Sequence, residues 1–129
     1  MTKSYTYETG KIYCIMSKCS NKCYVGHTIQ PLKVRLQKHK TDFRGYCGFD
    51  ENKYRNYRGS FELLCNDEYD IYLLESYPCT TKKELEKQEA KWMFKMSSEY
   101  EMTNKYMPSK IGYDDLEDIK NLQIPKLFS

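Results

Sequence analysis

Apolar and polar positions alternate in two short segments near the N-terminus. Residues 11–17, KIYCIMS, and residues 22–28, KCYVGHT, have this two-residue period, which predicts two β-strands. The intervening KCSN is typical of a turn, so the strands are expected to form an antiparallel hairpin. The pattern leaves the register open, and a slip of one residue would move Tyr24 to the other face. Gly26 indicates either a close approach of backbone or ligand, or a simple bend.

The segment after the hairpin, residues 28–40, has the period of a helix. Pro31 suits the first helical position, and two leucines four residues apart mark the expected core face. Arg35 and His39 are also four apart, so they are expected to point the same way from a neighbouring face. A guanidinium forks well onto phosphate oxygens. This pair therefore indicates a phosphate site or, alternatively, a solvated basic helix.

A second and longer helix is expected over residues 80–100. Thr81 and Glu84 fit a capping box, and Leu, Trp and Met recur behind them at helical spacing. Glu89 falls on or beside this apolar stripe. A carboxylate in such a place is costly unless it is paired, protonated or bound to a metal. Two interpretations stay open: a salt bridge to a nearby Lys or Arg, or a metal-binding or catalytic role.

The other segments are less regular. Residues 42–69 are expected to form a long loop, with a short helix near 52–58, and the FELL within it is left unassigned. Residues 69–77, YDIYLLESY, predict a strand that Pro78 ends. The tail, residues 109–129, carries spaced apolar residues. It is expected to pack on the core as a short helix, or to dock a partner or a second copy.

The length of 129 residues is typical of one domain, and no apolar run is long enough to span a bilayer. The N-terminus lacks the apolar centre of a signal peptide, so an intracellular protein, cytoplasmic or nuclear and not secreted, is expected. Six cysteines form no Cys-x-x-Cys pair, which argues against a zinc site. The thiols are expected to be reduced, with Cys14 and Cys23 acting as small apolar strand residues.

Charge is distributed unevenly, although the net charge is only +3. Residues 30–60 hold eight bases and three acids, whereas residues 61–101 hold five bases and ten acids. Tyrosines are interleaved with the bases, and this mixture suits a nucleic-acid backbone, although a solvated face would look the same. The candidate DNA contacts are Lys33, Lys38, Arg44, Arg55 and Arg58.

Six positions in order resemble the GIY-YIG nuclease superfamily. Lys11-Ile12-Tyr13 stands for the first tripeptide and Tyr24-Val25-Gly26 for the second, and the matches run from residue 10 to about residue 108. The arginine, the histidine, the metal-binding glutamate and the late asparagine of the family are matched by Arg35, His39, Glu89 and Asn104. Lys11 replaces a glycine. His27 stands where other members have a lysine or a small polar residue, so it is expected to be a weak phosphate contact or to have no role.

The resemblance implies an α/β (α+β) fold over residues 1–108, in which a small three-stranded antiparallel sheet is flanked by helices. It also implies a DNA endonuclease that hydrolyses phosphodiester bonds and leaves 5′-phosphate and 3′-hydroxyl ends. One divalent ion, Mg²⁺ or Mn²⁺, would be bound by Glu89 and would stabilise the leaving oxygen.

The resemblance assigns a role to each matched side chain. Tyr13 would position and deprotonate the attacking water with help from His39, and Tyr24 would hold the phosphate or share the water. A free phenol titrates near pH ~10, so Tyr13 needs a nearby cation or a proton relay. Arg35 would neutralise the developing charge, and Asn104 would orient Glu89 or a phosphate.

The choice of substrate is left open by the sequence. There is no zinc finger or helix-turn-helix motif after residue 108, so specificity is expected from the basic segment 43–60, from a partner protein or from a homodimer. The main alternative is a catalytically weak DNA-binding module of the same fold that acts with a partner. A protein whose basic face docks an acidic partner is a further alternative.

Overall fold

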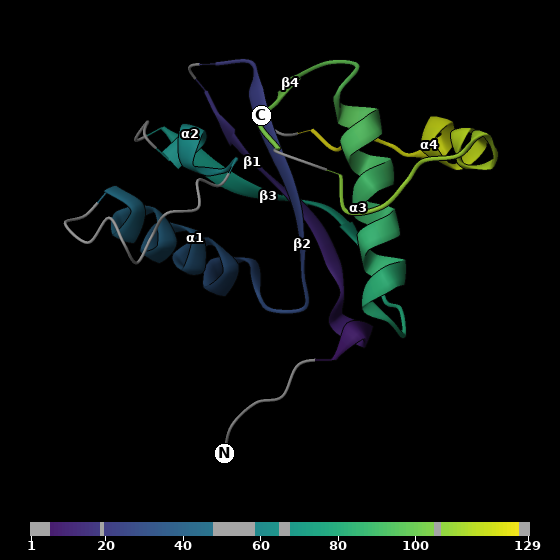
Figure 1. Cartoon of the computed structure of the whole chain (residues 1–129), viewed down its shortest axis with the longest axis horizontal. Helices are drawn as coiled ribbons and strands as arrows, with labels where there is room; N and C mark the ends of the chain where they lie inside the picture. Colours follow the sequence, from purple (N-terminus) through teal and green to yellow (C-terminus); the bar gives the residue numbers. More distant parts are fainter. Residues whose placement is uncertain (1–5, 19, 48–58, 65–67, 105–106, 127–129) are drawn as a thin grey trace.

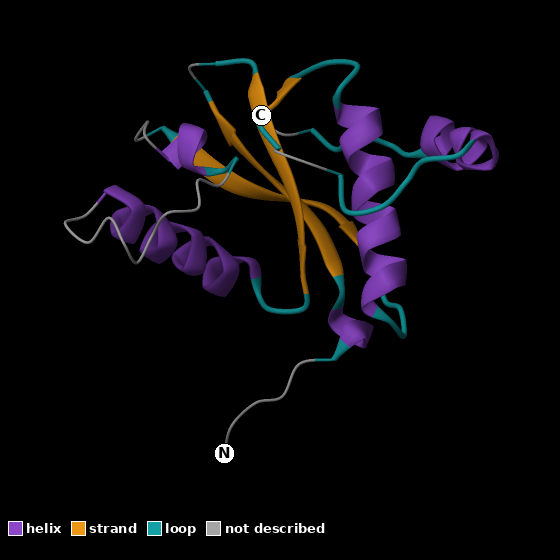
Figure 2. Ribbon diagram, viewed as in Figure 1, coloured by secondary structure: helices purple, strands orange, loops and turns teal. Residues whose placement is uncertain are grey.

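The computed structural model describes residues 6–18, 20–47, 59–64, 68–104 and 107–126. It has an α+β architecture in which one sheet lies between α1 and α2 on one face and α3 on the other, with α4 outside α3 (Figures 1 and 2). The elements in order are the 3-10 turn η1 (Tyr7–Thr9), β1 (Lys11–Ser17), β2 (Lys22–Thr28), α1 (Leu32–Cys47), α2 (Phe61–Leu64), β3 (Tyr69–Ser76), α3 (Lys82–Met96), β4 (Glu101–Met102), the 3-10 turn η2 (Tyr113–Asp115) and α4 (Leu116–Asn121).

The sheet has the strand order β3-β1-β2-β4. β1 pairs antiparallel with both β2 and β3, as expected for the hairpin and the later strand, and Tyr13 lies directly opposite Gly26. The expected count of three strands is wrong for the described residues, because β4 adds a fourth, parallel to β2. A strand of two residues has no alternation to detect, and its pairing partner lies about 80 residues away in the chain.

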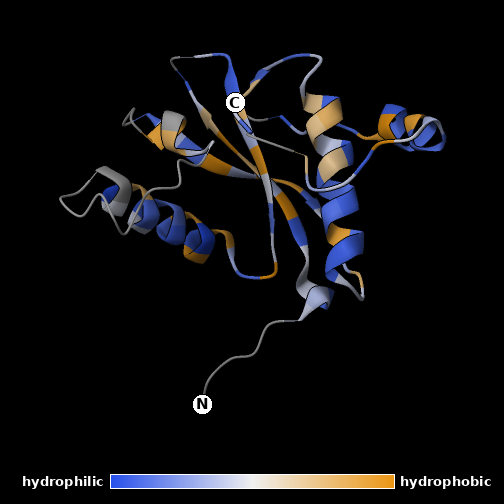
Figure 3. Cartoon of the chain, viewed as in Figure 1, coloured by the Kyte–Doolittle hydropathy of each residue, from blue (hydrophilic) through white to orange (hydrophobic). Residues whose placement is uncertain are grey.

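Alternate residues of β1 face two separate cores. Ile12, Cys14 and Met16 belong to the core beneath α3, whereas Tyr13 and Ile15 belong to the core beneath α1 and α2. Cys14 and its neighbour Cys23 are buried free thiols in the first core, which confirms their expected apolar role. In Figure 3 the central strands carry hydrophobic stretches while α1 is mostly hydrophilic, as expected for a helix with one buried side.

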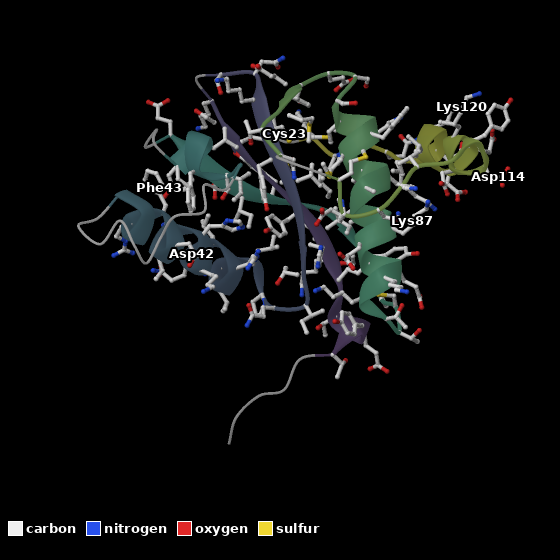
Figure 4. The ribbon with its side chains drawn as sticks, viewed as in Figure 1. Cys23, Asp42, Phe43, Lys87, Asp114 and Lys120 are labelled. Carbon is white, nitrogen blue, oxygen red and sulfur yellow. The ribbon has the colours of Figure 1, made fainter. Side chains whose placement is uncertain are left out.

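The first helix is longer than expected. α1 begins at Leu32, just after Pro31, and continues to Cys47 instead of ending near residue 40. Asp42 forms an i,i+4 ion pair with Lys38 at 3.3 Å, and Phe43 packs against Phe61 of α2 with ring centroids 5.5 Å apart (Figure 4). These contacts stabilise a last turn that the local sequence, with its glycine and aromatic residues, does not favour on its own.

The segment expected to be a loop thus contains helix at both ends. The FELL left unassigned from sequence is the short helix α2, which begins directly after Ser60. The short helix expected near residues 52–58 lies outside the described residues.

The two predicted elements that flank Pro78 are confirmed. β3 ends at Ser76, and α3 begins after Thr81, whose hydroxyl accepts a hydrogen bond from the Glu84 amide at 3.2 Å. The Glu84 carboxylate accepts hydrogen bonds from the hydroxyls of Thr80 and Thr81. The cap is therefore made by side chains on both sides of the helix start.

The tail contacts the outer side of α3. Ile119 of α4 is only 5% exposed, and two lysines of α3 form ion pairs with tail carboxylates: Lys87 with Asp115 at 2.7 Å and Lys91 with Asp118 at 3.0 Å. Figure 4 shows Lys87 on the side of α3 that faces the tail. Among the described residues, none of the helices has the length and apolar composition needed to cross a membrane.

Candidate active site

A chain of hydrogen bonds beneath α1 centres on the phenol of Tyr13. The side chain has no exposed surface, and its hydroxyl lies 2.7 Å from Nε2 of His39 and 3.0 Å from Nε of Arg35. An arginine N–H can only donate, so the phenol oxygen accepts from Arg35. The bond to His39 runs from the phenol hydrogen to Nε2 in the tautomer of His39 that leaves Nε2 without a proton.

The second ring nitrogen of His39 completes the chain. Nδ1 lies 2.8 Å from the hydroxyl oxygen of Ser60, and both residues are buried, at 1% and 0% exposed. With Nε2 as an acceptor, a neutral imidazole carries its proton on Nδ1 and donates it to Ser60. Ser60 was not identified from the sequence, because nothing in its local pattern distinguishes it from other serines.

Backbone packing brings Ser60 to this position. Ser60 lies at the start of α2, where its carbonyl accepts hydrogen bonds from the amides of Leu63 and Leu64. The preceding Gly59 packs so closely on Thr103 that a Cβ would overlap the Thr103 carbonyl. Glycine at position 59 therefore permits the close backbone contact with Thr103 that places Ser60 beside His39.

Gly26 also has a packing reason. A Cβ at this position would lie 2.5 Å from the hydroxyl oxygen of Tyr13 and 2.6 Å from its Cζ atom. The bend interpretation is therefore wrong, and the close approach is made by the Tyr13 ring across the hairpin rather than by backbone or ligand. The glycine of the second tripeptide makes room for the tyrosine of the first.

Burial dominates the electrostatics of Tyr13. It raises the pKa of the phenol well above its ordinary value, and Tyr24 and Glu89 act in the same direction. The charge and hydrogen bond of Arg35 lower the pKa but do not outweigh burial. The phenol is accordingly neutral at neutral pH, while Arg35, whose ordinary pKa is above ~12, remains a cation.

Tyr24 lies on the same face of the sheet as Tyr13. Its ring meets the His39 ring edge-on with centroids 5.5 Å apart, and the Tyr13 ring does the same at 5.9 Å. Tyr24 is half-buried, whereas Tyr13 is fully buried. The structure thus brings together Tyr13, Tyr24, Arg35 and His39, as the sequence predicted, and gives the two tyrosines different access to solvent.

Glu89 lies on the opposite face of the sheet. It is 7% exposed, and its Oε1 lies 2.6 Å from Nδ1 of His27. Among the described residues the partner of Glu89 is a histidine and not the expected Lys or Arg. The phosphate contact expected of His27 stays a prediction. Alternation along β2 explains the pairing, because His27 follows Cys23 and Val25 onto the α3 face.

The two faces meet at the end of β2. Among the described residues β2 pairs with β4 only through Lys22 and Cys23, so its last residues form a sheet edge that both faces can reach. A pocket of about 220 Å³ opens there. Its lining residues are Tyr7, His27, Thr28, Ile29, Arg35 and Lys82. One pocket therefore combines Arg35 of α1 with His27, and Glu89 lies behind His27 beneath α3.

Asn104 has a different contact from the one expected. Its Oδ1 accepts from the Val25 amide at 3.1 Å, and its Nδ2 donates to the Val25 carbonyl at 2.7 Å. The side-chain amide pairs with β2 as a neighbouring strand would. Its polar atoms therefore hold the YVG segment in place. The orientation of Glu89 or a phosphate by Asn104 stays a prediction.

The predicted DNA contacts lie partly on α1. Lys33, Lys38 and Arg44 are exposed there, and Lys38 is paired with Asp42. Lys33 and Arg44 are eleven residues apart, which places them on one side of the helix. The predicted contacts Arg55 and Arg58 lie outside the described residues. Lys82, which lines the pocket at the start of α3, was missed because it adjoins a strongly capped helix start and resembles an ordinary surface lysine.

The residues at the pocket are compatible with one divalent ion. Among the described residues no three His, Cys, Asp or Glu side chains gather as a ligand set, so a closed metal cage is not formed there. Mg²⁺ is typically held by one or two carboxylates together with water and substrate phosphates. The Glu89 carboxylate beside an open pocket fits this mode of binding.

The amino-acid sequence of the chain matches a known protein family. The model of the GIY-YIG catalytic domain matches residues 9–108. No significant match was found among curated proteins or among solved structures. The chain belongs to the GIY-YIG family, a class of nuclease domains that generally use a divalent metal ion. DNA is the substrate that such a domain implies.

Proposed function

We propose that the protein is a metal-dependent DNA endonuclease that hydrolyses phosphodiester bonds at the pocket beside the end of β2. The observation that carries the proposal is the hydrogen-bonded chain from Arg35 through Tyr13 to His39. A structural tyrosine needs one polar partner, whereas this phenol has both a cation and a proton acceptor. That combination suits a group that must pass on a proton.

The relay acts on the attacking water. Because Tyr13 has no exposed surface, the relay requires that substrate binding uncover its hydroxyl to the water. The water proton then moves to the hydroxyl oxygen of Tyr13 as the phenol proton moves to Nε2 of His39, and the resulting hydroxide attacks phosphorus. Ser60 accepts the Nδ1 proton of His39 and so holds Nε2 ready to receive. Because the pKa of Tyr13 is raised, the two transfers occur together, and no free phenolate accumulates.

The pocket cations bind the phosphate. Arg35 stays charged and is fixed by its bond to Tyr13, so its guanidinium neutralises charge that develops on the phosphoryl oxygens. Lys82 approaches the same pocket from the start of α3. Glu89 would hold one divalent ion, Mg²⁺ or Mn²⁺, and a bound ion of this kind supplies charge stabilisation to the leaving 3′ oxygen.

The test is cleavage of supercoiled plasmid and of a branched DNA with Mg²⁺ or Mn²⁺. Wild type is expected to nick only with a divalent ion, and Glu89→Gln is expected to lose about a hundredfold or more of the rate. Glu86→Gln, on the same helix, is the matched control and should cleave like wild type. Equal cleavage by Glu89→Gln would contradict the site.

One observation favours a second candidate function. Tyr13 has no exposed surface. A catalytically weak DNA-binding module of this fold would also retain such a fully buried chain of hydrogen bonds. That function predicts salt-sensitive DNA binding with no nicking under any divalent ion. The same assay separates the two.

A further inference from the structure

The contact between His27 and Glu89 joins two elements on the α3 face of the sheet. Nδ1 of the histidine and Oε1 of the carboxylate are 2.6 Å apart, and their side chains are 24% and 10% exposed. His27 also lines the pocket, whereas Glu89 lies behind it. The imidazole of His27 therefore lies between the carboxylate of Glu89, the predicted metal ligand, and the pocket where a phosphate would enter.

We propose that His27 is a second protein ligand of the divalent ion, so that Nδ1 of His27 and a carboxylate oxygen of Glu89 hold it together. The inference rests on the proposed function, because it concerns the same ion. It assigns the site a mixed nitrogen and oxygen donor pair. This pair favours a first-row transition ion such as Mn²⁺ or Co²⁺ over Mg²⁺.

The geometry needs little adjustment. Two ligands about 2.1 Å from an ion, at a right angle to one another, are about 3 Å apart. The observed separation of 2.6 Å is a hydrogen bond, and a small rotation of the imidazole would open it to that distance. Binding through Nδ1 would use the neutral imidazole tautomer that carries its proton on Nε2.

The donor set explains the expected preference. Oxygen ligands suit Mg²⁺, whereas an imidazole nitrogen suits first-row transition ions, whose affinity for such sites rises along the series. Two of the other side chains that line the pocket, Arg35 and Lys82, are cations and cannot be ligands, and the Thr28 hydroxyl already accepts a hydrogen bond from the Gln30 amide. Two protein ligands thus leave the remaining coordination positions to water and phosphate oxygens.

The histidine content makes a direct test feasible, since the chain has only two histidines. The Mn²⁺-loaded protein is measured by electron spin-echo envelope modulation, which detects the ¹⁴N coupling of a bound imidazole. The coupling is expected in wild type, absent in His27→Ala and retained in His39→Gln. Labelling wild type with ¹⁵N-histidine should alter the same signal, which makes the assignment independent of whether a variant folds.

A titration measures the selectivity. His27→Ala is expected to weaken Mn²⁺ binding by about tenfold or more, and to weaken Mg²⁺ binding by clearly less. Equal changes for the two ions, or tighter binding of both, would mean that His27 only pairs with Glu89 and would overturn the proposal.

The two proposals fail in different ways. Mn²⁺ bound at Glu89 without histidine coupling would overturn the ligand role of His27 and leave the nuclease intact. In that case wild type would still show metal-dependent cleavage, and Glu89→Gln would still bind no ion. A wild-type protein that binds no divalent ion and cleaves no DNA would overturn the proposed function itself.

Discussion

At the scale of single residues, the site is governed by which groups donate and which accept. Arg35 can only donate, so its bond to Tyr13 has a fixed direction, and the proposed relay continues in that direction from Tyr13 to His39 and from His39 to Ser60. Burial makes each of these bonds costly to lose. The chemical role proposed for Tyr13 depends on this fixed direction more than on its own acidity.

Ser60 is expected to position His39. In wild type the ¹H–¹⁵N correlation spectrum should show His39 with its proton on Nδ1. In Ser60→Ala the Nδ1 acceptor is lost, so the second tautomer should appear, and the cleavage rate should fall about tenfold or more while DNA affinity stays unchanged. A single Nδ1–H tautomer in both proteins, with equal rates, would show that Ser60 does not position the ring.

Tyr13 is expected to make stability fall at alkaline pH. Burial raises the pKa of its phenol, so above pH ~10 the unfolded chain loses this proton while the folded chain keeps it. The free energy of unfolding then decreases as pH rises, by at most about 1.4 kcal/mol per pH unit. Urea unfolding between about pH 9 and pH 11 should show a shallower decline for Tyr13→Phe. Parallel declines would contradict the raised pKa.

At the scale of elements, β2 carries the site because its two faces serve different helices. Tyr24 and Gly26 face α1, while Val25 and His27 face α3. Among the described residues, no strand pairs with β2 beyond Cys23. The end of β2 is therefore a sheet edge that borders the pocket. A fully paired strand would separate the relay from the carboxylate.

Gly26→Ala tests this packing. The added Cβ meets the Tyr13 ring, which is buried and bonded at its hydroxyl and cannot move away freely. Urea unfolding is expected to show a loss of about 1–3 kcal/mol. Gly112→Ala is the matched control, because a Cβ there is 3.7 Å from its nearest neighbour, and its stability should change by less than about 0.5 kcal/mol. Equal stabilities of both variants would contradict the close contact.

At the scale of the whole molecule, the sequence predicted those features that have a local period. The hairpin, β3 and α3 follow from periods of two and 3.6 residues, and the helix cap follows from a local motif. The convergence of Tyr13 and Arg35 was implied by the family resemblance. The long last part of α1, the two-residue β4 and the contacts of Ser60 and His27 depend on residues distant in sequence. Periodicity cannot report such partners, so these features emerged only from the structure.

The basic side chains on α1 should give DNA binding a steep dependence on salt. Each phosphate contact removed is expected to lower the slope of log affinity against log salt by about one. Lys33→Ala and Arg44→Ala, which change one side of α1, should each have this effect. Lys126→Ala is the control, because this exposed lysine near the C-terminal end of the described chain is not among the predicted contacts. Equal slopes for all proteins would exclude α1 from the DNA interface.

The measurement that tests the central claim most directly is single-turnover cleavage by Tyr13→Phe, with DNA affinity determined on the same samples. The substitution removes one oxygen, which separates Arg35 from His39 and leaves the ring in place. The rate is expected to fall about a hundredfold or more, while DNA affinity stays within about twofold of wild type. A Tyr13→Phe protein that cleaves at the wild-type rate would contradict the account.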